Sequence, residues 1–144
     1  MSLLSAMDIA SSSLSAESYR LNLTASNLAN ANSVSSSINR TYRGRHPVFT
    51  TISANPDATA FGDVMDGLGR GVRLAAVVES AAPLRKEYHP ENPLANKEGY
   101  VFLPNVNTIE EMANMISASR SYSSNIEVFN SAKQMLLRTL TLGQ

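Results

Sequence analysis

Apolar residues recur with a helical period at both ends of the chain. From Leu3 to about Ala31 the sequence has no Gly or Pro, and a large apolar residue stands at every seventh position. This spacing predicts one stripe along a helix, formed by Met7, Leu14, Leu21 and Leu28. The companion heptad positions are mostly small, which permits the close approach of a second helix: Leu4, Ser11, Ser18 and Ala25. Because serine is a middling helix former, the twelve serines among the first 37 residues predict a helix that is marginal alone.

The C-terminal segment carries a stronger heptad pattern. Positions from 112 to 140 at alternating spacings of three and four residues are apolar at seven places out of nine. The seven are Met112, Met115, Tyr122, Ile126, Phe129, Leu136 and Leu140. Asn107 and Thr108 each stand three residues before a glutamate, Glu110 or Glu111, so either pair predicts a cap at the helix start. Gly143 predicts its end.

Further apolar residues flank this stripe and widen it, at Ile116, Val128 and Leu137. Seven buried side chains at about 1.5–3 kcal/mol each offer on the order of 10–20 kcal/mol before conformational entropy is subtracted. Since one partner helix covers only one side of the stripe, we expect more than one neighbour.

Between the helical segments the apolar period changes to two, which predicts short strands at 48–52, 72–79 and 100–103. Gly, Pro and Asn gather at 32–37, 55–71 and 89–99, which predicts loops there. The predicted fold class is therefore α+β, with long terminal helices around a small β-rich insert. We expect an assembly helix over 1–32, the insert over 33–104 and a second assembly helix over 105–144.

The composition and the motifs argue against most kinds of catalytic, metal-binding and nucleotide-binding site. Twelve Lys and Arg balance twelve Asp and Glu, so the charge gives no reason to expect nucleic acid or a membrane surface as a partner. There is no cysteine, and the two histidines, His46 and His89, have neither metal-ligand spacing nor a serine motif to activate. Gly67, Gly69 and Gly71 lack the Lys-Ser/Thr of a phosphate loop. We expect no enzyme activity, no metal and no cofactor.

Two further features bear on partners and location. Arg40, Arg43 and Arg45 form a basic patch that favours a protein contact or a solvated loop over phosphate binding, given the zero net charge. The opening MSLLSAMDIASSS lacks the basic start and apolar core of a secretory signal, and no apolar run reaches the roughly 20 residues of a membrane helix. We expect a protein that is not inserted in a membrane and whose export leaves no cleaved signal.

Three asparagines close the first helical segment, at Asn27, Asn30 and Asn32 in the run ASNLANANS. Asparagine tolerates the left-handed conformation that ends helices and bonds free backbone groups nearby. A helix cap followed by a turn accounts for Asn30 or Asn32 alone. Three asparagines within six residues predict something beyond a cap.

The run ASNLANANS resembles the N-terminal signature of the axial proteins of the bacterial flagellum, the family of rod, hook and hook-associated subunits. Residues 1–22, 88–105 and 105–144 are similar to the proximal-rod members of that family, whereas 33–70 carry little of the resemblance. The resemblance implies that the terminal helices pack as an antiparallel, coiled-coil-like pair. It also implies a helical, tubular assembly that transmits torque, leaves a channel and spans the periplasm as the basal-body rod.

The same resemblance implies the partners: copies of the chain itself, other rod proteins and the flagellar type III export apparatus. The residues expected to make the assembly contacts are the apolar stripes of both helices with Asn27, Asn30 and Asn32. Heptads alone leave open an export-linked adaptor that binds another flagellar protein one to one. A wall hydrolase would need a carboxylate or Ser/His constellation, which the sequence does not contain.

Overall fold

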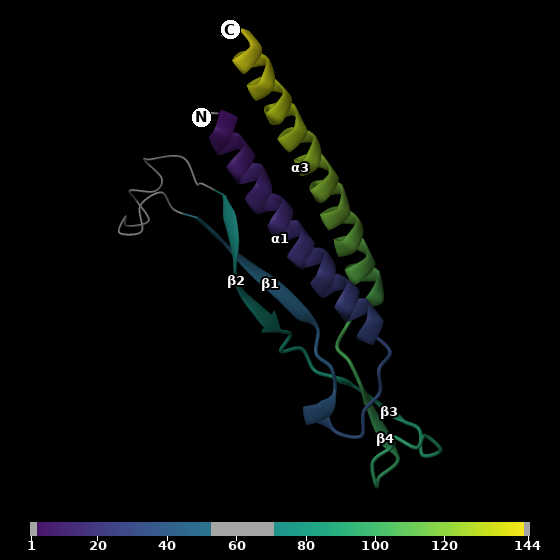
Figure 1. Ribbon diagram of the computed structural model, residues 1–144. Coiled ribbons are helices and arrows are strands. Elements are labelled where there is room, and N and C mark those ends of the chain that lie inside the picture. Colours follow the sequence, from purple (N-terminus) through teal and green to yellow (C-terminus); the bar gives the residue numbers. More distant parts are fainter. Residues whose placement is uncertain (1–2, 53–70, 143–144) are drawn as a thin grey trace. The chain divides into compact units, whose positions relative to one another are not determined.

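The computed structural model describes residues 3–52 and 71–142 of the chain. Its two long helices are α1 (Leu3–Asn30) and α3 (Thr108–Leu142), of 28 and 35 residues. Between them lie a 3-10 helix, η1 (Ile38–Arg40), and the strands β1 (Arg45–Thr51), β2 (Val72–Glu79), β3 (Arg85–Tyr88) and β4 (Tyr100–Leu103) (Figure 1). The predicted α+β class, with terminal helices and a small β-rich insert, is confirmed.

The described residues belong to two compact units. Unit 1 takes its residues from Met1–Tyr19, Val48–Ala76 and Ser117–Gln144, and unit 2 from Arg20–Pro47 and Val77–Ile116. Unit 1 therefore contains the start of α1 and most of α3, whereas unit 2 contains the end of α1, the β3–β4 pair and the start of α3. Neither helix belongs to one unit alone.

In both units α1 and α3 run antiparallel and side by side (Figure 1). In unit 1, Leu14 of α1 and Tyr122 of α3 line the same cavity. In unit 2, the side-chain amide of Asn27 donates a hydrogen bond of 3.0 Å to the carboxylate of Glu111. The antiparallel helix pair that the flagellar resemblance implied is therefore present.

The strands form two separate two-stranded sheets, β1–β2 and β3–β4. In β3–β4 the strands are antiparallel, with Arg85 opposite Leu103 and Tyr88 opposite Tyr100. Ser35 pairs with Phe102 of β4 as an isolated bridge, which ties the segment after α1 to this sheet. The sequence patterns predicted β2 and β4 at their observed bounds and part of β1. They missed β3, because its sequence RKEY has no apolar alternation and all four residues are exposed.

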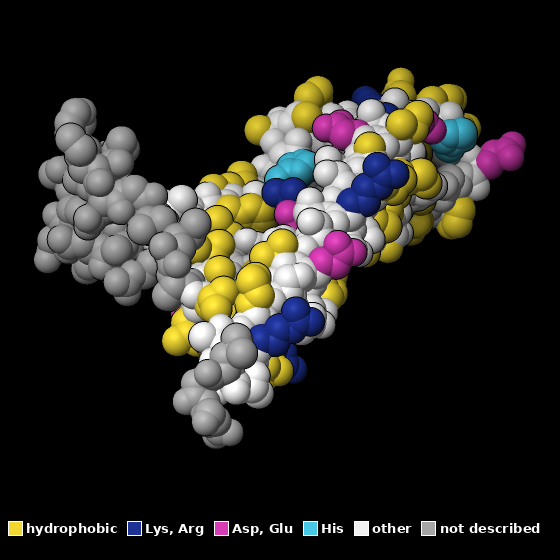
Figure 2. Space-filling view, turned by 90° about the horizontal axis from the view of Figure 1, so that it is seen from above, with side chains coloured by type: hydrophobic (Ala, Val, Ile, Leu, Met, Phe, Trp, Pro, Cys, Tyr) yellow, Lys and Arg dark blue, Asp and Glu magenta, His cyan; other side chains and the backbone are white. Residues whose placement is uncertain are grey.

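The apolar core of the described residues is thin and consists mainly of alanines: Ala10, Ala16, Ala31, Ala118 and Ala132, with Val101 and Val106. Large apolar side chains remain exposed on both helices, among them Leu4, Met112 and Leu140. On the face seen in Figure 2, hydrophobic side chains reach the surface between scattered charged ones. The chain therefore has apolar contact area left for other chains.

The helix ends differ in part from the predictions. At the start of α3, Asn107 accepts a hydrogen bond from the backbone N–H of Ile109 at 3.1 Å, so Asn107 is the capping residue. Glu111, predicted as a possible capping partner of Thr108, instead bonds to Asn27. At the end of α1, Asn30 donates its side-chain amide to the carbonyl of Ser26 at 2.8 Å. No non-glycine residue in the described ranges has a positive φ. The expectation that a left-handed asparagine ends α1 is therefore wrong. Gly143 lies outside the described residues.

Gly71 lies just before β2, in unit 1, and packs against α1. Its φ is +127°, and a Cβ there would overlap Ser12 Oγ, which accepts a hydrogen bond from the Val72 N–H at 3.1 Å. Ser12 in turn donates to the Ile9 carbonyl at 2.8 Å.

We expect Gly71→Ala to lower the free energy of unfolding by about 1–3 kcal/mol, because the backbone is strained and the Ser12 contact is lost. Denaturant unfolding of the purified protein measures this effect. Gly44→Ala is the matched control, since a Cβ at Gly44 would meet only ordinary contacts of 3.6 Å or more. Equal unfolding midpoints for the two variants would contradict the role given to Gly71.

Candidate functional site

Asn27 is the centre of a buried polar network in unit 2 and is 0% exposed. Its side-chain N–H groups donate to the Arg45 carbonyl at 2.9 Å and to Glu111 Oε1 at 3.0 Å. Its side-chain oxygen accepts from the Tyr42 hydroxyl at 2.8 Å and from the Arg45 N–H at 2.9 Å. An amide has two donors and two acceptor positions, so every one of them is used. Asn27 thereby joins α1 to β1 and to α3.

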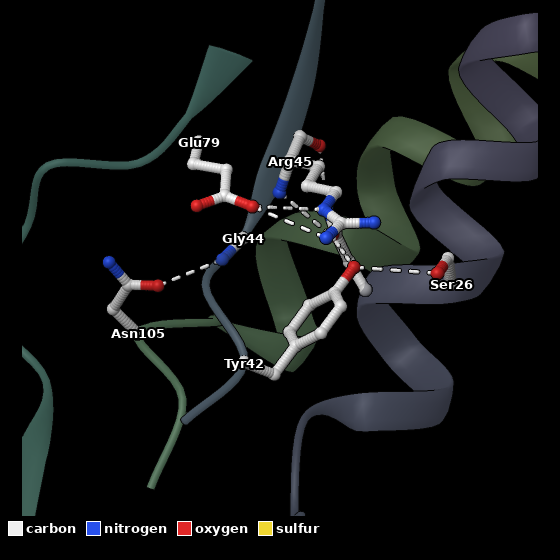
Figure 3. Close-up of polar contacts among 7 residues, drawn as sticks. Ser26, Tyr42, Gly44, Arg45, Glu79 and Asn105 are labelled. Atoms are coloured by element: carbon white, nitrogen blue, oxygen red, sulfur yellow. Dashed lines mark hydrogen bonds and ion pairs between the residues drawn. The ribbon is translucent and has the colours of Figure 1, made fainter. Parts of the chain in front are cut away.

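A second asparagine anchors the same segment from the other side. The Asn105 side-chain oxygen accepts from the Gly44 N–H at 2.9 Å (Figure 3). Its amide donates to the carbonyls of Ser80 and Ala82 at 3.2 and 2.8 Å. The Gly44–Arg45 backbone is therefore held by an asparagine on each side. Loop segments that would otherwise leave backbone groups unpaired are satisfied by side chains here.

The predicted basic patch is largely engaged within the chain. Arg43 donates to the Ser80 carbonyl at 3.1 Å, and Arg45 forms an ion pair of 3.2 Å with Glu79 (Figure 3). The Arg45 guanidinium also lies over the Tyr42 ring, 5.5 Å from its centre. Arg43 and Arg45 therefore have partners inside unit 2.

The three asparagines of the signature have different places. Asn27 is fully buried, Asn30 is half-buried and bonds within its own helix, and Asn32 is exposed. The excess over a simple cap therefore lies in Asn27. Its partners Tyr42, Glu111 and Arg45 could not be predicted from the local pattern, because they lie 15 to 84 residues away along the chain.

The α3 stripe predicted as one seam is divided between two faces. The face toward α1, here called the inner row, is buried or half-buried throughout: Glu111, Met115, Ala118, Tyr122, Asn125, Phe129, Ala132 and Leu136. Four predicted residues, Met115, Tyr122, Phe129 and Leu136, lie in it. The other predicted residues, Met112, Ile126 and Leu140, are 55%, 38% and 63% exposed.

The outer row of α3 follows the inner row one residue later at every position. It is exposed throughout and consists of Met112, Ile116, Ser119, Ser123, Ile126, Asn130, Lys133 and Leu137. Its spacing alternates between four and three residues, which is the heptad of a helix-contact surface. The outer row therefore has the form of a second seam without a partner in the described part of the chain.

On α1 the predicted stripe is half-buried at all four positions, Met7, Leu14, Leu21 and Leu28. Each of these four residues is followed by an exposed one. The exposed residues form a row of their own, here called the outer row of α1: Leu4, Asp8, Ser11, Ser15, Ser18, Asn22, Ala25 and Ala29. Most of these side chains are small. Each helix thus has one covered row and one open row.

The described ranges contain no candidate metal-binding cluster. No group of His, Asp and Glu there has the size and spacing of a metal site, and His89 bonds to Glu87 at 3.2 Å on the surface. Neither described helix has a stretch long and apolar enough to cross a membrane. Two features of these ranges remain as candidates for function. One is the buried hydrogen-bond network around Asn27, here called the polar anchor, and the other is the pair of exposed outer rows on α1 and α3.

Glu111 offers a direct test of the polar anchor, because it is 4% exposed and accepts from Asn27. We expect Glu111→Leu to cost about 1–3 kcal/mol of unfolding free energy, since one N–H of Asn27 loses its partner. Glu111→Gln keeps an acceptor oxygen and is expected to cost less. Denaturant unfolding compares the two variants, and an equal loss in both would show that the hydrogen bond is not what Glu111 contributes.

Comparisons with known proteins match the same terminal regions. The family model described as flagella basal body rod protein matches residues 7–35, and the one described as flagellar basal body rod FlgEFG protein C-terminal matches residues 97–142. Proteins named flagellar basal-body rod protein FlgC from Salmonella typhimurium, Yersinia enterocolitica and Borreliella burgdorferi are 50%, 47% and 37% identical to this chain. The matches cover 100% of this chain and 100%, 100% and 99% of those proteins. The chain belongs to the FlgC family of flagellar basal-body rod proteins.

Proposed function

We propose that this chain builds the rod of the flagellar basal body through contacts between its terminal helices and those of neighbouring subunits. The observation that carries the proposal is the outer row of α3. Met112, Ile116, Ile126 and Leu137 stand exposed at heptad spacing, although the inner row already faces α1. A helix with two apolar rows needs a second partner to cover the second row.

The energetics support contacts with neighbours. Burial of a large aliphatic side chain contributes about 1.5–3 kcal/mol, so the four large residues of the outer row offer several kcal/mol for each subunit contact. The thin alanine core leaves this area uncovered in the single chain. The polar anchor at Asn27 holds the end of α1 beside the start of α3, so the helix surfaces are presented together.

The finer features of the proposal follow the flagellar resemblance. The partners are copies of the chain and other rod proteins, and the protein leaves the cell through the flagellar type III export apparatus with its N-terminus uncut. In the rod it serves as a stiff element that transmits torque around a channel. It catalyses no reaction.

The test is complementation of a motile bacterium from which its own member of this family has been deleted. We expect the chain to restore swimming and to be recovered in purified basal bodies with an uncut N-terminus, as read by mass spectrometry. Recovery only as a one-to-one complex outside the basal body would instead identify an export-linked adaptor. Absence of the chain from basal bodies would contradict the proposal.

A further inference from the structure

The open rows of α1 and α3 in unit 1 have matching patterns when they are compared residue by residue. The α1 row in this unit is Leu4, Asp8, Ser11, Ser15 and Ser18, and the α3 row is Leu137, Lys133, Asn130, Ile126 and Ser123 when read backwards. Both lists advance by four, three, four and three residues. Two helices with these rows can therefore pack antiparallel with each residue opposite its counterpart.

The chemistry of the counterparts agrees along this alignment. Leu4 falls opposite Leu137, and the polar Ser11 and Ser18 fall opposite Asn130 and Ser123. Asp8 and Lys133 are the only charged residues in their rows, they carry opposite charges, and the alignment places them face to face. Neither forms an ion pair with another residue of the described ranges. Opposite charges at matched positions select both the partner and the register of a helix contact.

The remaining pair, Ser15 and Ile126, matches in shape. Ser15 lines an open cavity of about 410 Å³ together with Leu14, Ser18, Tyr19 and Tyr122. Ile126 is an exposed, branched apolar side chain. A large residue opposite a small one with space around it is the arrangement of a knob in a hole.

We infer that the α1 row of one copy packs antiparallel on the α3 row of a second copy, with Asp8 facing Lys133 and Ile126 entering the cavity at Ser15. The inference rests on the proposed function, since it names which surfaces of two subunits meet. The two surfaces are unlike, so a copy that uses its α1 row still has its α3 row for another copy. Contacts between unlike surfaces are the kind that extend into a helical assembly.

A charge exchange tests the contact in the deletion strain described above. We expect Asp8→Lys and Lys133→Asp each to reduce the number of completed basal bodies at least tenfold, because like charges then face each other. The double variant is expected to recover most of the wild-type number, because the pair is restored in reverse. Glu127→Lys, on an exposed position of α3 outside the row, is the control and is expected to assemble normally.

Cysteine cross-linking provides a second readout, since the chain has no cysteine of its own. Ser15→Cys and Ile126→Cys, placed in separate copies and expressed together, are expected to form a disulfide between chains in assembled basal bodies. Neither variant is expected to cross-link when expressed alone.

The outcomes separate this inference from the proposed function. Failure of the unmodified chain to complement would overturn both. Complementation by the unmodified chain, together with normal assembly of both single charge variants, would overturn the inference alone. A double variant that stays defective while the mixed cysteine variants do not cross-link would also overturn it.

Discussion

Asn27→Ala is expected to destabilise unit 2 more than any other single replacement of a polar residue in the described chain. The change removes four hydrogen bonds at once and leaves the Arg45 backbone, Glu111 and Tyr42 without their shared partner. A buried polar group without a partner costs about 1–3 kcal/mol, so we expect a loss of about 3 kcal/mol or more. Denaturant unfolding followed by far-UV circular dichroism measures the change.

Asn32→Ala is the matched control, because it makes the same replacement five residues later at an exposed position. We expect it to change the free energy of unfolding by less than about 0.5 kcal/mol. Tyr42→Phe removes only one of the four bonds and should fall between the two. If Asn27→Ala unfolds at the same denaturant concentration as Asn32→Ala, the network is not what holds α1 to β1 and α3.

Ile126→Asp is expected to leave the protein made and exported but to block rod growth. Ile126 lies in the open row of α3, so a carboxylate there does little harm to the single chain. Once a neighbour covers that row, the charge is buried without a partner, which costs several kcal/mol. A loss of about 4 kcal/mol corresponds to a contact weaker by about a thousandfold.

The measurements for Ile126→Asp are swimming in soft agar and the yield of basal bodies from the complemented deletion strain. Ser124→Asp places the same charge two residues away on an exposed position of α3 outside the outer row. We expect that control to swim. Normal swimming by Ile126→Asp would contradict the assignment of the outer row as an assembly contact.

The helices and most of the strands could be predicted because their patterns are local. The heptads bounded α1 and α3 closely, and period-two alternation located β2 and β4. The strand β3 could not be found this way, because RKEY pairs through its backbone and buries no apolar side chain. β3 is a strand because it pairs with β4, and no pattern in its own sequence predicts that pairing.

The faces of α3 show why a contact surface is harder to predict than a helix. Apolarity alone marked Met112, Ile126 and Leu140 as members of the same seam as Met115 and Phe129. The face toward α1 instead includes Glu111, Ala118, Asn125 and Ala132, which are polar or small. Small residues fit there because the neighbouring helix comes close, and Glu111 fits because Asn27 bonds to it. The exposed apolar residues follow a different row, which has no partner among residues 3–52 and 71–142.

Asn27 illustrates the same limit from the side of the polar residues. The signature ASNLANANS indicated that its asparagines do more than end a helix, and it pointed to the flagellar axial proteins. Which asparagine carries the extra role depends on burial, and its partners depend on segments far along the chain. Those contacts exist only after the chain has folded.

A density map of the intact basal body from the complemented strain tests most directly whether the terminal helices assemble the rod. We expect the outer row of α3, from Met112 to Leu137, to be covered along its length by helices of neighbouring subunits. An outer row that faces open solvent or the channel, with neighbours touching only the β-rich insert, would contradict the account.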